Sequence, residues 1–264
     1  MLDTYSGATR VYFIIGDPIA QAKAPRYFTQ ALRANGVDAV VVPAHVGSAD
    51  LAAFFATAKA MRNCDGVVVT VPHKFDALAY CEGATPRARS IGGVNVMRRT
   101  PMGGWWGDQV DGEGYLAGLR AKGCDPAGRK VLLVGAGGAG SAIARSLADA
   151  GVARLAVHDA DPARRDELLS KLSDSAVARP ADSADPAGFD IVINATPLGM
   201  GPDDALPLPE ARLAPGQFVG EVVAQPEVTA LVAAARARGC RTMTGMDMFN
   251  GVLDRMVDFY SPRS

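Results

Sequence analysis

Short apolar runs alternate along most of the chain with segments whose apolar residues recur at helical spacing. In the first half this pattern predicts strands at 11–16, 38–42 and 67–71 and a hairpin from 94–97 and 105–106. Pro25 is expected to open the helix after the first strand, and Ser48 to cap the helix that carries Leu51 and Phe55. Buried parallel strands appear as continuous apolar runs joined by amphipathic helices. The first half is therefore expected to form an α/β sheet.

The second half repeats the alternation. It predicts strands at 130–134, 153–157, 190–194, 218–223 and 241–243 and helices at 141–150, around Leu168, at 228–238 and over 246–260. A polar stretch from 173 to 188 interrupts the pattern. Strands that alternate with helices form βαβ units with parallel pairing, and ligands bind beyond the carboxyl ends of such strands. We therefore expect an α/β protein with two lobes and a cleft between them.

The strand at 130–134 runs directly into the glycine loop, Gly135-Ala136-Gly137-Gly138-Ala139-Gly140, which fits G-x-G-x-x-G. Between a strand and a helix, the first glycine permits the turn, the second lets backbone approach a pyrophosphate, and the third lets the helix pack on the strand. The free N–H groups of the helix would then face the pyrophosphate. This context predicts a dinucleotide site. The alternative is a glycine turn in an α/β fold that binds no nucleotide.

Asp159 follows the next strand, about twenty residues beyond the glycines. A carboxylate at this place accepts hydrogen bonds from both ribose hydroxyls of NAD and repels the 2′-phosphate of NADP. We therefore expect NAD as the cofactor, with NADP less favoured.

The composition argues against several kinds of partner. A formal net charge of −1 provides no basic surface for nucleic acid, and no apolar run approaches the roughly 20 residues of a membrane helix. The 4 cysteines lie far apart without C-x-x-C spacing, and the 3 histidines are scattered, so no metal site is predicted. Without a visible secretory segment, we expect reduced thiols and a cytoplasmic protein.

Two charged residues lie where chemistry is expected. Lys74 follows the strand at 67–71, and Asp111 stands at the start of a helix that carries Tyr115. Ligands bind at the strand ends of open α/β sheets, so Lys74 is a candidate for catalysis. From the residues alone, each also has a plainer interpretation, namely a solvated loop lysine and a helix-capping aspartate.

A series of motifs stands in order along the chain. They are Gly16-Asp-Pro-Ile, Val69-Thr-Val-Pro-His-Lys74, Gly92-Gly-Val-Asn95, Gly107 to Gly114, Asn194-Ala-Thr196 to Met200, and Gly245-Met-Asp-Met248. This series resembles the motifs of the shikimate dehydrogenase family, which reduces 3-dehydroshikimate with NADPH. The resemblance covers essentially the whole chain. It implies a substrate-binding and catalytic domain over 1–110, completed by a C-terminal helix at 244–264, and a Rossmann-type dinucleotide-binding domain over 111–243.

The resemblance also implies roles for single residues. Lys74 and Asp111 would form the catalytic pair, because hydride transfer between nicotinamide and a carbinol carbon requires a positioned group that gives or takes the proton. Thr70 and Asn95 would bind ring hydroxyls of the substrate. Beside the glycine loop and Asp159, the cofactor would contact Asn194, Ala195, Thr196, Met200 and Val223.

The substrate pocket departs from the family pattern. Ala22 and Ala24 replace the two serines that hold the substrate carboxylate in the family. Gln109, Ala224 and Val252 stand where the family has an asparagine, a tyrosine and a glutamine. Each lost polar partner costs roughly 1 to 3 kcal/mol, so several together weaken binding more than about a thousandfold. We therefore expect a related cyclic alcohol with fewer polar groups as substrate, and weak or no activity on shikimate or quinate.

The residues around Asp159 bear on the cofactor again. NADP-dependent members of the family carry an N-R-T type sequence after this strand, whereas His158-Asp159-Ala160-Asp161 resembles the NAD-using quinate/shikimate members. A second function class is an NAD-binding sensor without turnover, but a sensor has no chemical reason to keep Lys74 and Asp111. No nucleic-acid or membrane partner is expected, and the protein is expected to be a monomer or a homodimer.

Overall fold

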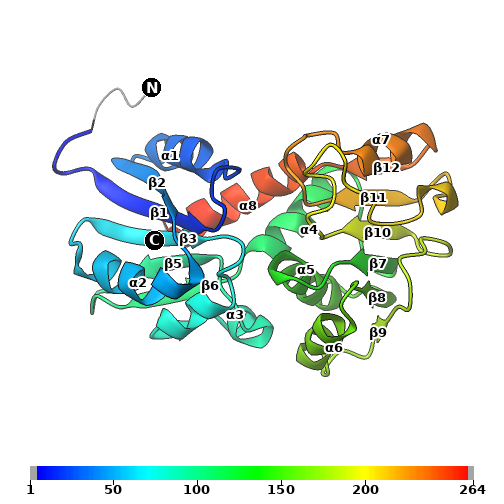
Figure 1. The fold of residues 1–264 in the computed structure, drawn as a ribbon, viewed down its shortest axis with the longest axis horizontal. Coiled ribbons are helices and arrows are strands. Elements are labelled where there is room, and N and C mark those ends of the chain that lie inside the picture. Colours follow the sequence, from blue (N-terminus) through cyan, green and yellow to red (C-terminus); the bar gives the residue numbers. More distant parts are fainter. Residues whose placement is uncertain (1–4, 261–264) are drawn as a thin grey trace. The chain divides into compact units, whose positions relative to one another are not determined.

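The computed structural model describes residues 5–260 and divides them into two compact units (Figure 1). The first unit holds residues 5–110 and 253–260, and the second holds residues 111–252. The last helix, α8 (Gly245–Tyr260), therefore contributes to both units. This differs from the sequence-based expectation, which assigns 244–264 to the first domain and ends the second at 243. Residues 261–264 lie outside the described residues.

A mixed six-stranded sheet forms the first unit, with the strand order β2-β1-β3-β5-β6-β4. Its strands are β1 (Arg10–Gly16), β2 (Ala39–His45), β3 (Cys64–Val69), β4 (Gly83–Ala84), β5 (Val96–Arg99) and β6 (Trp105–Asp108). β1 pairs in parallel with β2 and β3, and β5 pairs antiparallel with β3 and β6, which confirms the predicted hairpin. The carboxyl ends of β1 and β3 thus meet at one edge of the sheet.

Apolar side chains cover both faces of this sheet. The helices are α1 (Ala24–Ala34), α2 (Leu51–Ala60) and α3 (Pro86–Ile91). On one face Phe55 and Val67 belong to a buried cluster. On the other face the ring of Tyr260, at the end of α8, packs edge-on against Tyr12 at 5.1 Å between centroids and lies 5.3 Å from Phe28. Burying one such side chain stabilises the fold by about 2 kcal/mol, so α8 is anchored firmly to the first sheet.

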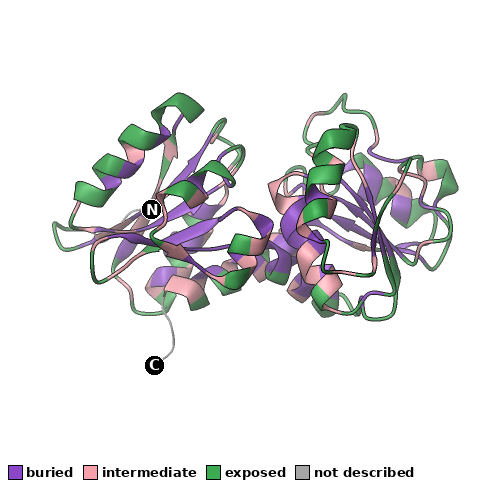
Figure 2. Ribbon diagram, turned by 90° about the horizontal axis from the view of Figure 1, so that it is seen from below, coloured by how far each residue is buried: buried purple, intermediate pink, exposed green. Residues whose placement is uncertain are grey.

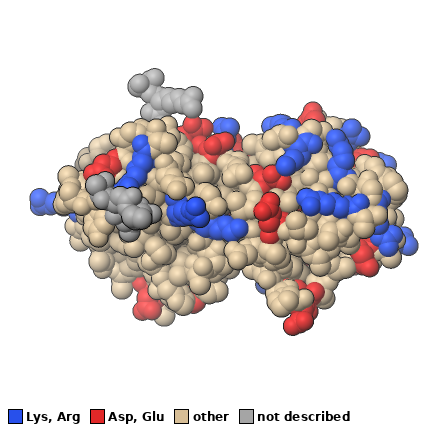
Figure 3. Space-filling model, turned by 90° about the horizontal axis from the view of Figure 1, so that it is seen from above, with Lys and Arg blue, Asp and Glu red and all other residues tan. Residues whose placement is uncertain are grey.

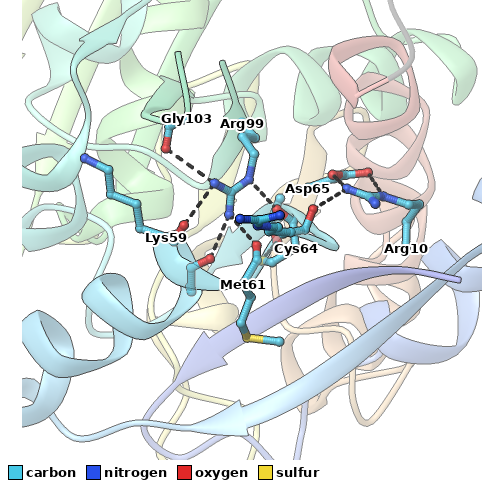
Figure 4. A network of polar contacts seen from close by, with 10 residues as sticks. Arg10, Lys59, Met61, Cys64, Asp65, Arg99 and Gly103 are labelled. Atoms are coloured by element: carbon cyan, nitrogen blue, oxygen red, sulfur yellow. Dashed lines mark hydrogen bonds and ion pairs between the residues drawn. The ribbon is translucent and has the colours of Figure 1, made fainter. Parts of the chain in front are cut away.

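Arg99 ties the end of α2 to the hairpin (Figure 4). Its guanidinium donates over 2.6 to 3.1 Å to the carbonyl oxygens of Ala58, Lys59, Met61 and Cys64. A helix leaves its last carbonyls without intrahelical partners, and its dipole favours a cation there. The guanidinium also lies 4.9 Å from the centre of the Trp105 ring, while Arg10 pairs with Asp65 in β3. These contacts fix the amino-terminal end of β3.

Two details of the first unit differ from the prediction. Ser48 begins a 3₁₀ turn over Ser48–Asp50, and α2 begins only at Leu51, with Asp50 at its N-cap and no side-chain capping bond. The predicted cap is wrong because the tighter turn takes up the residues before the helix. β3 begins at Cys64 and not at 67, since the less apolar residues before Val67 still pair with β1.

The second unit is a doubly wound parallel sheet, as predicted. Its strands are β7 (Lys130–Val134), β8 (Arg154–His158), β9 (Ala178–Pro180), β10 (Ile191–Asn194), β11 (Phe218–Glu221) and β12 (Arg241–Met243). They lie in the order β12-β11-β10-β7-β8-β9, and all pairs are parallel. This is the 3-2-1-4-5-6 order of dinucleotide-binding folds, which reverses direction between β7 and β10. The strands of both sheets are largely buried (Figure 2).

Helices cover this second sheet as well. They are α4 (Asp111–Ala121), α5 (Gly138–Asp149), α6 (Pro162–Lys171) and α7 (Ala230–Ala237). A Cβ added to Gly112 would lie 2.2 Å from the Ala142 carbonyl oxygen in α5, and one added to Gly114 would lie 2.4 Å from Cγ2 of Val252 in α8. The absence of side chains at these two positions therefore lets the first turn of α4 pack closely on α5 and α8.

Several elements in the second unit begin or end elsewhere than predicted; β11, for example, ends at Glu221 and not at 223. α5 begins at Gly138 and not at 141, because these glycines adopt helical geometry without contributing to the apolar pattern. β9 lies in the stretch predicted to be an irregular polar segment; it is a short edge strand that pairs with β8 and ends at Pro180. α7 spans Ala230–Ala237 within the predicted 228–238, with Thr229 as its cap.

Charge is mixed on the surface. On the face that Figure 3 shows, acidic and basic side chains lie interspersed among uncharged ones. Within residues 5–260, no helix has the length and apolar character needed to cross a membrane. No group of His, Cys, Asp and Glu side chains in the same described range could hold a metal ion.

Candidate cofactor and catalytic sites

The glycine loop has the geometry that its sequence predicts. Gly135 has a φ of 107°, a conformation that L side chains rarely adopt, and an added Cβ would lie 2.7 Å from the Ala195 carbonyl carbon. A Cβ added to Gly140 would lie 2.1 Å from the carbonyl oxygen of Gly135. These two glycines therefore allow the loop after β7 to fold tightly on itself and against the loop after β10.

The second glycine of the motif faces open space. Gly137 is the N-cap of α5, and an added Cβ would meet no other protein atom within 4 Å. The backbone N–H groups of the first helical turn have no intrahelical partners, and the helix dipole favours an anion beside them. The loop over Gly138 and Ala139 thus fits the pyrophosphate of a dinucleotide, which backbone alone would contact.

Asp159 lies next to this loop, at the end of β8. Its Oδ2 accepts the Ala136 N–H over 2.7 Å, and its Oδ1 accepts the Asp161 N–H over 2.9 Å. Nη1 of Arg164 lies 3.9 Å from Oδ1. The carboxylate is therefore held in place beside the glycine loop, where the adenosine ribose lies in dinucleotide-binding folds.

The loop after β10 contains the next predicted cofactor residues. Asn194 is fully buried, and its Oδ1 accepts both the N–H and the hydroxyl of Thr196, over 3.0 and 2.7 Å. Ala195 donates its N–H to the Val134 carbonyl over 2.7 Å and touches Gly135. Met200, at the end of the loop, is 52% exposed. The structure thus brings Asn194, Ala195 and Thr196 against the glycine loop, whereas Met200 lies at the surface.

Sequence reasoning missed Glu221, which is the residue that organises this end of the sheet. Its carboxylate is completely buried and accepts a hydrogen bond from Nδ2 of Asn194 over 2.9 Å. It also accepts the N–H of Val223, another predicted cofactor residue, over 3.0 Å. The sequence could have indicated Glu221 only as a single acidic residue within the apolar strand predicted at 218–223.

Lys74 lies in a turn that follows β3 and is held on several sides. The Lys74 carbonyl accepts the Val94 N–H over 2.8 Å, and Thr70 donates its N–H to Ile15 over 2.9 Å. His73, also missed at the sequence level, is fully buried, and its Nε2 lies 2.6 Å from the Val46 carbonyl. The Lys74 side chain is largely buried, with 9% exposed. The backbone around this lysine is therefore rigidly placed at the carboxyl edge of the first sheet.

Asn95 connects this edge to the residues before Asp111. Its Oδ1 accepts the Val110 N–H over 2.9 Å, so the side chain predicted to bind substrate also supports the backbone. Asp111 begins α4 and is buried. Lys74 belongs to the first unit and Asp111 to the second, and the predicted meeting of the two side chains stays a prediction.

An ion pair between the half-buried Arg87 and the buried Asp108 supports the same strand end. The Asp108 carboxylate accepts from Nε and Nη2 of Arg87 over 2.7 and 2.5 Å and from the Thr85 hydroxyl over 2.5 Å. It also accepts the N–H of Gln109 over 2.7 Å. Arg87 and Asp108 were not identified at the sequence level, although Asp108 lies within the motif from Gly107 to Gly114. They hold Gln109, which is buried, in the segment that leads to α4.

The remaining predicted substrate residues present apolar groups. Ala22 lies in the loop after β1, with its N–H donated to Ile19, and Ala24 begins α1 and is buried. Neither carries a hydroxyl that could bind a carboxylate. Val252 packs against Gly114, between α8 and α4.

Comparison with known proteins agrees with this architecture. A family model described as the shikimate dehydrogenase substrate binding domain matches residues 14–97. The shikimate dehydrogenase (NADP(+)) of Acidiphilium cryptum is 40% identical over 243 residues, which cover 92% of this chain and 87% of that protein.

Two solved structures are similar over almost their full length. The 5-ketofructose reductase of Gluconobacter sp. strain CHM43 has a TM-score of 0.85 and 29% identity, covering 98% of this chain and 95% of that one. The Listeria monocytogenes shikimate 5-dehydrogenase in complex with shikimate and NAD has a TM-score of 0.89 and 28% identity, covering 100% and 96%. Taken with the fold and the glycine loop, these similarities show that the chain belongs to the shikimate dehydrogenase family of NAD(P)-dependent oxidoreductases.

Proposed function

We propose that this protein is a dehydrogenase that uses NAD to interconvert a small cyclic alcohol and its ketone, and that its preferred substrate carries no carboxylate. The observation that carries the proposal is the combination of a family-type catalytic lysine, held rigidly at the end of β3, with alanine at both positions where the family has carboxylate-binding serines. The cofactor, when bound, accepts or supplies the hydride.

Lys74 supplies the proton chemistry in this proposal. In the oxidative direction its neutral amine takes the proton from the substrate hydroxyl as hydride leaves the same carbon, and in reduction its ammonium group returns the proton to the carbonyl oxygen. Asp111 orients the amine and stabilises the ammonium form.

The substrate proposal rests on Ala22 and Ala24. A carboxylate that loses its hydrogen-bond donors on binding pays a desolvation cost of roughly 1 to 3 kcal/mol for each missing partner. A neutral ring alcohol pays no such cost at these methyl groups. One protein of similar structure is named for 5-ketofructose, a ketose without a carboxylate, and this supports a substrate range beyond shikimate.

The preference for NAD rests on Asp159. Its carboxylate, fixed by Ala136 and Asp161, would accept from the ribose hydroxyls and would repel a 2′-phosphate. The A. cryptum relative is named for NADP(+), whereas the L. monocytogenes structure contains NAD, so both cofactors occur among similar proteins. For this protein, we base the choice between NAD and NADP on the negative charge of Asp159.

Steady-state kinetics test the proposal. Shikimate, quinate and carboxylate-free cyclic polyols and hydroxyketones are compared with NAD and with NADP, with nucleotide absorbance as the readout. We expect the highest kcat/KM for a carboxylate-free substrate with NAD. A kcat/KM near 10⁶ M⁻¹s⁻¹ for shikimate, in the range of efficient enzymes, would overturn the substrate proposal. A higher kcat/KM with NADP than with NAD would overturn the cofactor proposal.

A further inference from the structure

Glu221 is a carboxylate in the interior of the second unit. It ends β11 and has no exposed surface. Burying a charged group is costly unless hydrogen bonds replace its hydration. Burial raises the pKa of Glu221 above its ordinary value, and the hydrogen bonds it accepts oppose that shift. Burying this carboxylate therefore costs stability, and the hydrogen bonds that it accepts indicate its structural role.

Four hydrogen-bond donors point at this carboxylate. Oε1 accepts the N–H groups of Val222 and Val223 over 2.8 and 3.0 Å and Nδ2 of Asn194 over 2.9 Å. Oε2 accepts the hydroxyl of Thr229 over 2.9 Å. An ionised carboxylate is the side-chain group that only accepts, so it satisfies all four donors at once. A neutral amide of the same size would place an NH₂ group against at least one of them.

The bond to Asn194 sets the shape of the loop after β10. With Nδ2 turned to Glu221, and to the Leu198 carbonyl over 3.1 Å, Oδ1 of Asn194 points at the N–H and hydroxyl of Thr196. The amide therefore has one orientation, and the loop over 194–198 wraps around it. Loss of the carboxylate would free this amide to rotate.

The other bonds set the loop after β11. The N–H groups of Val222 and Val223 turn inward to Glu221, and the Thr229 hydroxyl, which donates to Glu221, also accepts the Val232 N–H at the start of α7. One carboxylate thus joins the loop over 194–198, the loop over 222–229 and the amino terminus of α7.

These two loops belong to one half of the cofactor site. In a doubly wound fold each half of the sheet binds one mononucleotide, and Asp159 assigns the adenosine half to the side of β7 to β9. The carboxyl ends of β10 and β11 then lie under the nicotinamide half. We propose that Glu221 is a positioning residue, which holds the loops at 194–198 and 222–229 as a rigid platform for the nicotinamide half of the dinucleotide.

A pair of probes separates this role from a general structural one. ADP occupies only the adenosine half, whereas NADH or NADPH, whichever the unaltered protein binds more tightly, occupies both. Dissociation constants of both probes are measured on the full chain for Glu221→Gln and Glu221→Ala, together with kcat and KM for the nucleotide. The matched control is Asp190→Asn, because Asp190 accepts the Lys130 N–H over 2.8 Å at the opposite end of the same sheet.

We expect both Glu221 variants to weaken reduced-nucleotide binding at least tenfold while the dissociation constant of ADP changes less than twofold. Asp190→Asn should change neither constant. If the folded Glu221 variants bind both probes as the unaltered protein does, or if both constants rise together, Glu221 has no specific positioning role. Failure of the unaltered protein to bind either reduced nucleotide would instead overturn the proposed function.

A second variant covers the case in which the Glu221 variants do not fold. Thr229→Val keeps the carboxylate and removes the donor to Oε2. It should weaken reduced-nucleotide binding about threefold and leave ADP binding unchanged. Equal values for this variant and the unaltered protein would contradict the proposal.

Discussion

The Asp159 carboxylate accepts the backbone N–H of Ala136 over 2.7 Å, so the group expected to recognise the ribose also holds the glycine loop. The bond joins the end of β8 to the loop after β7, two segments that a dinucleotide must touch together. In the proposed cofactor site this charge would lie beside a 2′-phosphate, and Nη1 of Arg164 lies 3.9 Å from Oδ1 of Asp159.

Replacing Asp159 by Asn should shift the protein toward NADP. The amide keeps an oxygen for the Ala136 N–H but removes the negative charge, which leaves the guanidinium of Arg164 to attract the 2′-phosphate. We expect the ratio of kcat/KM for NADP to that for NAD to rise at least tenfold. Asp166→Asn removes a charge from the exposed face of α6 and should leave the ratio unchanged. An unchanged ratio for Asp159→Asn would show that this carboxylate does not set cofactor choice.

Restoring the two serines should restore recognition of a carboxylate. In Ala22→Ser/Ala24→Ser, two hydroxyl donors return to the loop and first turn that begin α1. At roughly 1 kcal/mol or more for each hydrogen bond, kcat/KM for shikimate should rise at least tenfold. The value for the best carboxylate-free substrate should stay level or fall. Equal improvement for both substrates would contradict the assigned role of these positions.

The hydroxyl of Tyr115 is buried, and no described residue gives it a hydrogen bond. Burial raises its pKa well above the ordinary value, so the group stays neutral. Tyr115→Phe should therefore leave the free energy of unfolding unchanged or raise it by about 1 kcal/mol. The control is Tyr260→Phe, because the Tyr260 hydroxyl donates to Val67 and accepts from Met97; this variant should lose about 1 to 2 kcal/mol. Urea denaturation measures both, and a clear loss for Tyr115→Phe would contradict the buried, unpaired hydroxyl.

The raised pKa of Glu221 predicts a specific dependence of stability on pH. Between its ordinary pKa of 4.5 and its raised pKa in the folded protein, the folded state binds more protons than the unfolded state. The contribution of Glu221 is therefore fully present below 4.5 and is lost as pH rises through the folded pKa. Unfolding curves measured across this window should show that decline, and Glu221→Gln should remove it. The same decline in the variant would assign it to another group.

Much of the fold follows from the apolar pattern alone. β7, β10 and β12 begin and end within one residue of the prediction, because buried parallel strands are continuous apolar runs between turn residues. The apolar pattern does not predict helical or extended segments that contain few apolar side chains. α5 starts in the glycines of the loop, and β9 is a short edge strand in a polar stretch.

The candidate site likewise contains some residues that the sequence indicates and others that it does not. Residues with a motif of their own, such as Gly135, Lys74 and Asp159, could be named as candidates from sequence. Residues that support them could not. Glu221 and Asp108 each accept from neighbouring backbone and from side chains 8 to 27 residues away in sequence, and only the folded chain brings those side chains together. For Glu221 the visible signal is limited to a single charge in an apolar strand.

The account depends most on Lys74 as the group that moves the proton. The direct test is kcat for the best substrate, measured beside the dissociation constant of the nucleotide, in the unaltered protein, in Lys74→Ala, and in Lys59→Ala, which removes an exposed lysine of α2. We predict that Lys74→Ala lowers kcat by about a hundredfold to ten-thousandfold and leaves nucleotide affinity unchanged, whereas Lys59→Ala changes neither. Turnover by Lys74→Ala at the rate of the unaltered protein would contradict the account.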